Sequence, residues 1–503
     1  MRRAILALLV SIALLTPLAA FGRSPKPMST KIANVLQPNS SPLVTFRIVF
    51  MTGAAADPTG KEGVAALTAA MLAQGGSRTL SYEQIVEAMY PMATSFGWQI
   101  DKEMTVFTGT THIDNLNKYY GLISQMLLDP GFRPDDFTRL RTDAVNFLKV
   151  SLRETNDEEL GKEYLYNIIY EGHPYEHHNM GTVSSIAKLT LDDLRAFYKA
   201  NYTHGNMVLG LAGGYPKELP AKVEAEFSKL PAGESVKAKF PTPKLAPGTR
   251  IALVKRETRA TALSLGFPIN VTRSDKDWPA LAMVASYFGQ HRNSSSYLYQ
   301  KLREARGLNY GNYAYIEYFP RGMFQFTPDP NLVRTSQIFQ IWIRPVTPEN
   351  GHFGLRAALY EYDKLVRKGM TKEAFEATRE FLTKYNNILT QTQDAQLGYA
   401  LDSRYYNIPD YVNYMREQLA KLTLEDVNTA IRKHLKSDAM RIVIITKDAE
   451  ALRDAILSNR LSPITYNSPK PKEITDEDKL IEAFKISVKP EDVVIVPVEK
   501  VFE

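Results

Sequence analysis

The segment EGHPYEHHNM contains a His-x-x-Glu-His pattern, from His173 to His177, that could carry chemistry. On a helix, two histidines at this spacing share a face and can bind zinc, and the glutamate between them can act as a general base on a metal-bound water. Pro174 argues against this arrangement, because a helix interior does not tolerate proline. We therefore expect a surface loop in which His173 has a structural role. The alternative is independent catalysis through His173, His177 or His178.

The other histidines do not extend this pattern. They lie singly along the chain without ligand spacing, so we interpret them as structural or surface residues: His112, His204, His291, His352 and His434. The chain has no cysteine and its formal charge is only +6. Charges of both signs alternate in stretches such as DKEM (101–104) and DEELGKEY (157–164). This alternation predicts a solvated surface and no nucleic-acid-binding stripe.

The elements that must position these residues form two similar halves. The first half opens with an apolar strand at 43–50, a loop containing Asp57 and a helix at 61–74. The second half repeats this order with the strand TALSLGFPI, the loop TRSDKD and the helix WPALAMVASYFG. Elsewhere Thr190 is predicted to cap a helix, with acidic residues in its first turn. We interpret the repeat as an internal duplication that gives two related α+β domains.

The boundaries of the domains follow from composition. A Pro- and Lys-rich stretch at 237–248 is predicted to be an extended linker. It separates an N-terminal domain at 28–236 from a second domain at 249–468. The remaining segment, 469–503, is charged apart from one apolar run, and we expect it to pack along a domain as an extension.

The first 22 residues are typical of a secretory signal peptide. Arg2 and Arg3 precede an apolar run at 4–15, and the small residues Ala19 and Ala20 follow. The alternative is an uncleaved membrane anchor, which is disfavoured because the apolar run is short for a span. We expect a periplasmic or secreted mature chain with no stable membrane span. Without cysteine, an exported chain must rely on packing for its stability.

Three segments, in order along the chain, resemble the pitrilysin/insulinase peptidases of family M16. They are GAAADPTGKEGVAALTAAMLAQGG (53–76), the stretch at 171–214 that contains HPYEHHNMGT, and SYLYQKLREARGLNYGNYAY (296–315). The resemblance covers both halves and implies two homologous α/β-sandwich domains of the M16/LuxS-like type that form one half of a clamshell. It also accounts for the HPY loop without a metal.

The resemblance implies a zinc site whose ligands this chain lacks. The first histidine, the glutamate and the second histidine of the family motif fall on Ala66, Ala69 and Ala70. In active members the two histidines bind zinc and the glutamate activates the metal-bound water. A methyl side chain can do neither. These three positions are therefore degenerate, and we expect no catalytic residue and no metal in this chain.

The last ligand of the family is also missing. It is a glutamate roughly 75 residues downstream of the motif, on another helix. The corresponding stretch from Ala144 to Leu152 has no carboxylate, and Asp143 and Glu154 flank it out of register. No glutamate follows the HPYEH segment at that distance either, near Ala252.

The resemblance further implies a role for Arg303 and Tyr310 in LREARGLNY. In M16 enzymes an arginine and a tyrosine at this spacing hold the substrate backbone and help to stabilise the oxyanion. Gly307 is predicted to end the helix, so the helix end and the following strand can bring both side chains to one spot. The alternative is that Arg303 only complements the helix dipole while Tyr310 packs in the sheet.

These expectations lead to two functions. The first is the non-catalytic, substrate-binding subunit of an exported heteromeric M16 zinc peptidase, which acts on peptides with zinc held by a partner subunit. The alternative is a non-enzymatic peptide-binding or scaffold protein of the same fold, like the core subunits of respiratory complexes.

Overall fold

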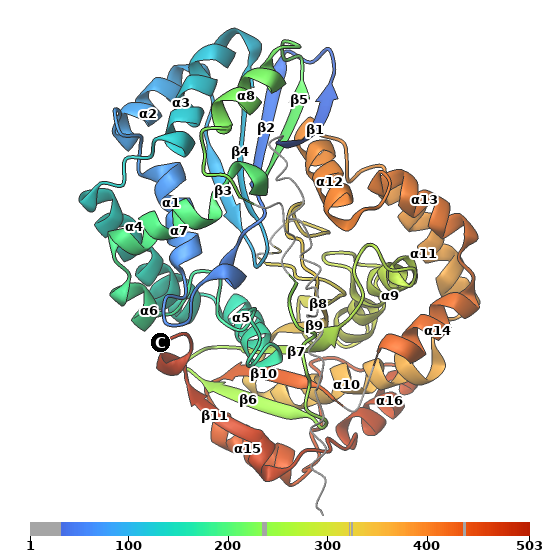
Figure 1. The fold of residues 1–503 in the computed structure, drawn as a ribbon. Coiled ribbons are helices and arrows are strands. Elements are labelled where there is room, and N and C mark those ends of the chain that lie inside the picture. The colour runs from blue at the N-terminus through green and yellow to red at the C-terminus, as the bar shows by residue number, and fades with distance from the viewer. Residues whose placement is uncertain (1–31, 234–238, 321, 323–324, 436–438) are drawn as a thin grey trace, which may run out of the picture.

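The structure is a computed structural model that describes residues 32–233, 239–320, 322, 325–435 and 439–503. The signal peptide expected at 1–22 and the first two residues of the linker expected at 237–248 lie outside the described residues. Strands of the described residues form two sheets, one in each half of the chain (Figure 1). Among the described helices, none combines the length and apolar character that a membrane span requires.

The first sheet has the strand order β1-β5-β2-β4-β3. β1 and β5 are parallel, and the other neighbours are antiparallel. The strands are β1 (Ala33–Pro38), β2 (Leu43–Phe50), β3 (Gly97–Ile100), β4 (Thr105–His112) and β5 (Met207–Gly213).

The second sheet repeats this arrangement. Its order, β11-β6-β10-β7-β9-β8, matches that of the first sheet with β11 added at one edge. The parallel and antiparallel neighbours also correspond. The strands are β6 (Arg250–Lys255), β7 (Thr261–Ile269), β8 (Gly311–Tyr315), β9 (Gln337–Val346), β10 (Arg441–Thr446) and β11 (Val493–Pro497). The common topology confirms the expected α+β class with two homologous domains.

Helices cover both sheets. In the first half they are α1 (Val64–Gln74), α2 (Tyr82–Met89), α3 (Leu116–Leu128), α4 (Pro134–Asn146), a π-helix (Phe147–Glu154), α5 (Asp157–Ile169), α6 (Val183–Lys188), α7 (Leu191–Asn201) and α8 (Leu219–Phe227). In the second half they are α9 (Trp278–Gly289), a π-helical turn (Tyr299–Glu304), α10 (Gly351–Lys368), α11 (Lys372–Tyr385), α12 (Gln393–Tyr406), α13 (Tyr411–Lys421), α14 (Leu424–His434), α15 (Ala449–Leu457) and α16 (Lys472–Glu482). Thr190 caps α7 as predicted, in a capping box with Asp193.

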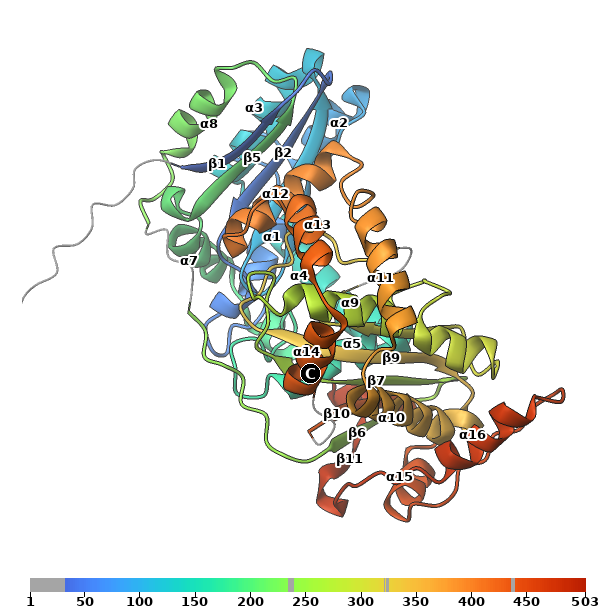
Figure 2. The same cartoon turned by 90° about the vertical axis from the view of Figure 1, so that its right-hand side faces the viewer.

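The two domains exchange one helix each. Because side chains alternate along a strand, Phe46 and Ile48 of β2 face the helices of their own domain, whereas Val49 faces α12 of the other half. Conversely, α5 of the first half packs on β7 and β10 of the second sheet. Figure 1 shows α12 beside β1 and β5, and Figure 2 shows the same packing from the side. The exchange gives the domains a shared apolar core.

The C-terminal extension joins the domains a second time. α16 packs against α10, and β11 adds a parallel strand to β6. The chain then crosses to the first domain, where Arg153 donates from Nε to the carbonyl of Val501 at 2.6 Å. Phe502 is buried and its carbonyl accepts from the backbone N–H of Val183 at 3.0 Å.

Candidate functional site

Helix α1 begins at a capped turn. The buried carboxylate of Asp57 accepts from the backbone N–H groups of Gly63 at 2.6 Å and Ala65 at 2.8 Å, which satisfies donors at the helix start. Gly63 has a φ of 95°, a left-handed conformation that suits glycine. The turn therefore aims α1 at the space between β3 and α4.

The three alanines lie on this helix. Ala66, Ala69 and Ala70 are all buried, and no residue of α1 carries a carboxylate, imidazole or thiol. Ala70 lines a cavity of about 400 Å³ together with Ala144 from α4. Its lining also includes His178 and the acidic residues Asp143, Glu159 and Glu163. Of the three motif positions, Ala70 is the one that lines this cavity.

The stretch from Ala144 to Leu152 continues α4 into the π-helix, which the sequence reasoning did not anticipate. Its buried residues Ala144, Leu148 and Leu152 belong to the core shared by the two domains. Asp143 lines the cavity, but its side chain is 65% exposed and lies 4.0 Å from Arg139. The π-helix therefore presents the isobutyl groups of Leu148 and Leu152 and the side chain of Arg153 to the interior, and no carboxylate.

The HPYEHH segment is not the surface loop that was expected. Tyr175 is fully buried, and His173 and His178 are less than a tenth exposed. His173 connects the segment to the linker. The Nδ1 atom of His173 accepts a hydrogen bond from the backbone N–H of Tyr175 at 3.0 Å. Its Nε2 atom therefore carries the proton and donates to the carbonyl of Pro241 at 2.8 Å. His173 is thus a buried residue that connects the segment to the linker, and not a residue of a surface loop.

The three histidines of this segment have separate partners. His177 Nε2 lies 3.0 Å from Asp57, the carboxylate that caps α1. His178 Nδ1 accepts from Met180, and its Nε2 lies 3.7 Å from Glu163. Across the described ranges of the chain, no group of three or more histidine, cysteine or carboxylate side chains could hold a metal ion.

The stretch DKEM and the residues LGKE of DEELGKEY are buried, which corrects the prediction of a solvated surface for them, whereas Asp157, Glu158 and Glu159 are partly exposed. Asp101, Lys102 and Glu103 are at most 5% exposed, and Lys162 and Glu163 are also buried. They are covered because α5 packs on the second sheet and the β3–β4 turn faces the opposite domain. Sequence alternation could not reveal this, since the covering surfaces come from the other half of the chain.

Burial changes the acidity of the groups near the cavity. It raises the pKa of Glu163 to about 7 and lowers that of Lys102 to about 7, because each charged form loses hydration. It also lowers the pKa of His178 to about 3. The imidazole of His178 is therefore neutral at physiological pH, and Glu163 accepts a hydrogen bond from Tyr318 at 3.2 Å.

Two acidic residues of this region connect the domains. Asp101 binds Arg334 through both carboxylate oxygens, at 2.6 and 2.8 Å. Glu103 accepts from Thr335 and from the phenol groups of Tyr175 and Tyr405. Arg334, Thr335 and Tyr405 were not singled out from the sequence, because their roles depend on contacts between residues more than 200 positions apart.

Arg303 and Tyr310 lie against one another. Gly307 has a φ of 67°, and its backbone N–H donates to the carbonyl of Arg303 at 2.7 Å, which ends the helical turn with an αL C-cap. The guanidinium of Arg303 is centred 5.1 Å from the ring of Tyr310, which is 71% exposed. The helix end therefore brings a cation and a phenol together at the surface.

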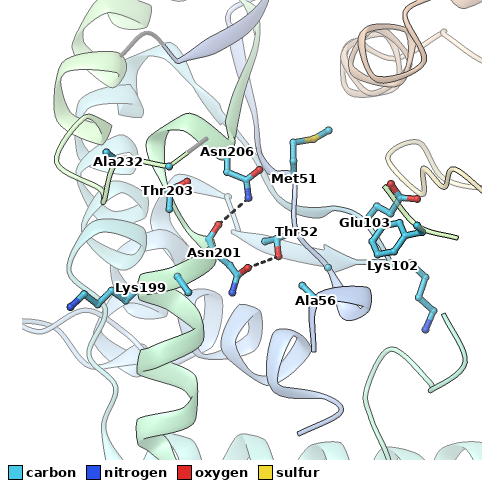
Figure 3. A pocket seen from close by; sticks show the side chains of 14 residues that line it. Met51, Thr52, Ala56, Lys102, Glu103, Lys199, Asn201, Thr203, Asn206 and Ala232 are labelled. Atoms are coloured by element: carbon cyan, nitrogen blue, oxygen red, sulfur yellow. Dashed lines mark hydrogen bonds between the residues drawn. The ribbon is translucent and has the colours of Figure 1, made fainter. Parts of the chain in front are cut away.

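A separate cleft of about 490 Å³ lies where β2 ends and α7 terminates. Figure 3 shows its polar wall, in which Asn206 donates to the carbonyl of Asn201 at 3.1 Å and Thr52 donates to the amide oxygen of Asn201 at 3.5 Å. Lys102 and Glu103 lie on the other side of this view. The hydroxyl and amide groups of this cleft bond to one another.

Comparison with known proteins places both halves of the chain in one family. Residues 34–183 match the family described as "Insulinase (Peptidase family M16)", and residues 188–382 match "Peptidase M16 inactive domain". The chain belongs to peptidase family M16. This agrees with the topology of the two sheets and with the resemblance of the motif segments.

Relatives within M16 carry different descriptions. An uncharacterized zinc protease of Mycobacterium leprae is 27% identical over 43% of this chain and 48% of its own length, so the match spans about half of that relative. A protein of Helicobacter pylori described as "Non-peptidase homolog YmxG" is 18% identical over 80% of this chain and 89% of its own length.

Solved M16 structures share the fold. The peptidase M16 inactive domain from Pseudomonas fluorescens has a TM-score of 0.72 and 23% identity over 83% of this chain and 96% of its own. The first half of the periplasmic protease PqqL from Escherichia coli has a TM-score of 0.65 and 14% identity over 92% of this chain and 97% of its own. The chain therefore has the architecture of one M16 clamshell half.

Restoring the M16 motif in α1 alone is expected to leave the chain without tightly bound zinc. The variant Ala66→His/Ala69→Glu/Ala70→His supplies two imidazoles, but the stretch from Ala144 to Leu152 still lacks the third ligand. Larger side chains at these buried positions should also cost about 1–3 kcal/mol each in stability. Zinc content after desalting, measured by elemental analysis on protein whose fold is checked by circular dichroism, tests this expectation. A full equivalent of retained zinc would contradict it and would point to Glu163 or His178 as an added ligand.

Proposed function

We propose that this chain is the non-catalytic, substrate-binding subunit of an exported heteromeric M16 zinc peptidase. The observation that carries the proposal is the Arg303–Tyr310 pair, with Tyr310 exposed, in a chain whose α1 has alanine at all three motif positions. Zinc and the general base would come from a partner subunit that bears His-x-x-Glu-His. The signal-peptide pattern at residues 1–22 supports export to the periplasm or beyond.

The chemistry of the pair suits an extended peptide. A guanidinium and a phenol both donate hydrogen bonds, and a peptide carbonyl that gains charge in the tetrahedral intermediate accepts them more strongly. Tyr310 is exposed, so a second subunit that closes over this surface can bring its zinc-bound substrate to the pair. Each subunit would then supply one part of a single site.

A reconstituted complex tests the proposal. The chain should copurify with a zinc-bearing M16 chain from the same organism and raise its peptide turnover. In the mixed complex, Arg303→Ala and Tyr310→Phe should each lower kcat by roughly 100-fold, the usual effect of losing one oxyanion donor. Arg432→Ala on α14, an exposed arginine outside this surface, is the matched control and should leave kcat unchanged.

Two outcomes would overturn the subunit role. Full turnover by the Arg303→Ala complex would show that Arg303 does not contact the substrate. Failure of every zinc-bearing relative to associate would show that the chain has no such partner subunit. The second candidate, a peptide-binding or scaffold protein without hydrolysis, is favoured by the likeness to a relative described as a non-peptidase homolog. It predicts peptide binding or assembly with no hydrolysis in any mixture.

A further inference from the structure

The second domain contains a small pocket built from the counterparts of the elements around Ala70. In the first domain α1 packs on β3 and α4, and in the second domain α9 packs on β8 and α11. The pocket is lined by all three of these second-domain elements and by α13. The duplication has therefore produced one cavity in each domain, but their linings differ.

The lining of the second-domain pocket is mainly apolar. Its volume is about 80 Å³, roughly half of the 150 Å³ cavity that accommodates benzene in an engineered protein core. Such a space suits one branched aliphatic side chain. Phe326 lines the pocket and is 39% exposed, so the pocket reaches the surface. The apolar walls include Ala282, Ala285, Leu382, Leu389 and Met415.

A buried hydrogen-bond donor in this lining has no acceptor. Asn386, at the end of α11, is only 4% exposed, and its amide nitrogen has no partner. The indole of Trp278, which is 2% exposed, has the phenol of Tyr411 as its polar neighbour. Burial raises the pKa of this phenol. A buried donor without a partner costs about 1–3 kcal/mol, so a ligand that brings an acceptor would recover this energy.

The charge of the pocket favours a neutral acceptor over a carboxylate. Glu317 is the acidic side chain of the lining, and Arg273 binds it at 3.1 Å. The same guanidinium binds Asp402 at 3.0 Å, so its charge is already shared between two carboxylates. An anion would meet this excess of negative charge. A peptide carbonyl brings an acceptor without a charge.

We infer that this pocket binds an aliphatic side chain of a peptide ligand, while the backbone carbonyl of the same residue accepts a hydrogen bond from the amide of Asn386. The inference rests on the proposed peptide-binding function and adds a side-chain preference to it. It places one anchoring contact in the second domain, where the apolar walls supply affinity and the unpaired amide of Asn386 fixes the orientation of the ligand.

Titration of the full chain with N-acetyl-L-leucine amide tests the inference, with N-acetylglycine amide as the reference probe. Isothermal titration should show binding of the leucine probe, and at least about tenfold weaker binding of the glycine probe because the pocket stays empty. Ala285→Leu, which fills the pocket, should weaken the leucine probe by at least about tenfold. Asn386→Ala should weaken it by roughly fivefold through the lost hydrogen bond.

A matched variant separates the two cavities. Ala144→Leu fills the cavity of the first domain and should leave the affinity for the leucine probe unchanged. Equal binding by wild type and Ala285→Leu, or no binding of the leucine probe at all, would overturn the inference. If Ala285→Leu fails to fold, as judged by circular dichroism, the affinity of Asn386→Ala for the leucine probe decides the test. An affinity equal to that of wild type would then overturn the inference. These titrations need no partner subunit, so their failure is distinct from a failure of the Arg303 experiment.

Discussion

Replacing Asp101 with alanine is expected to lower the free energy of unfolding by about 3–5 kcal/mol, the cost of leaving a buried charge unpaired. Asp101 is fully buried and binds Arg334 through both oxygens at 2.6 and 2.8 Å. Arg334 is 1% exposed and lies 3.6 Å from the ring centroid of Tyr318, so water cannot replace the lost carboxylate. Urea unfolding followed by circular dichroism measures the effect. Because this pair connects the domains, the slope of the transition also reports whether they still unfold together.

A double-mutant cycle separates the interaction energy between Asp101 and Arg334 from the cost of replacing each side chain alone. Arg334→Met and Asp101→Leu should each be about as damaging as Asp101→Ala, whereas the double variant Arg334→Met/Asp101→Leu should cost less than the sum of these two single variants, since it leaves no charge buried. Arg432→Ala, an exposed ion-pair residue on α14, should change stability by less than about 1 kcal/mol. Additive effects in the cycle, or a loss below about 1 kcal/mol for Asp101→Ala, would show that the guanidinium finds other compensation.

Glu163→Gln is expected to flatten the pH dependence of stability between about pH 4.5 and 7. Burial raises the pKa of Glu163 from 4.5 to about 7, and Glu159 adds to this rise, whereas Lys162, Lys102 and Arg334 oppose it. Between these values the native state holds a proton that the unfolded chain has released. The free energy of unfolding therefore falls as pH rises through this window, by roughly 3 kcal/mol in all.

Lys102 gives the opposite slope at higher pH. Burial lowers its pKa from 10.5 to about 7, so above pH 7 the unfolded chain binds the extra proton and stability rises with pH. Glu163→Gln should remove the acid-side decrease, and it should lower the pKa of Lys102 further because the charge of Glu163 raises that pKa. Urea unfolding at half-unit steps from pH 5 to 8 resolves the two contributions, with the exposed Glu304→Gln as control. A Glu163→Gln profile parallel to that of wild type between pH 5 and 7 would show that the carboxyl is already ionised.

Much of the local structure could be predicted because its causes are local. β2 is apolar and rich in β-branched residues, and it lies where the sequence indicated. Thr190 caps α7 because its hydroxyl accepts from the backbone of Asp193, a contact within one turn. Gly307 ends its helical turn for a local reason as well, because its φ of 67° is a left-handed conformation that suits glycine. The duplication was visible as a repeated strand–loop–helix order and is confirmed by the two sheets.

The interface between the halves could not be predicted in this way. The exchange of α5 and α12 depends on surfaces that form only when both sheets exist. It buries Lys162 and Glu163, which the alternation of charges had placed at the surface. The burial of the HPYEHH segment has the same origin, because His173 reaches the carbonyl of Pro241 in the linker.

The sequence by itself determined the family of the chain and its two-domain repeat. It also determined that α1 offers no metal ligand at the motif positions, because a methyl group at Ala66, Ala69 or Ala70 lacks ligand atoms in any conformation. Only the tertiary structure decided which charges are buried, which carboxyl keeps its proton near neutral pH and which donors lack partners. These properties depend on the atoms that surround a group, and for Asp101, Glu163 and Asn386 many of those atoms come from distant segments of the chain.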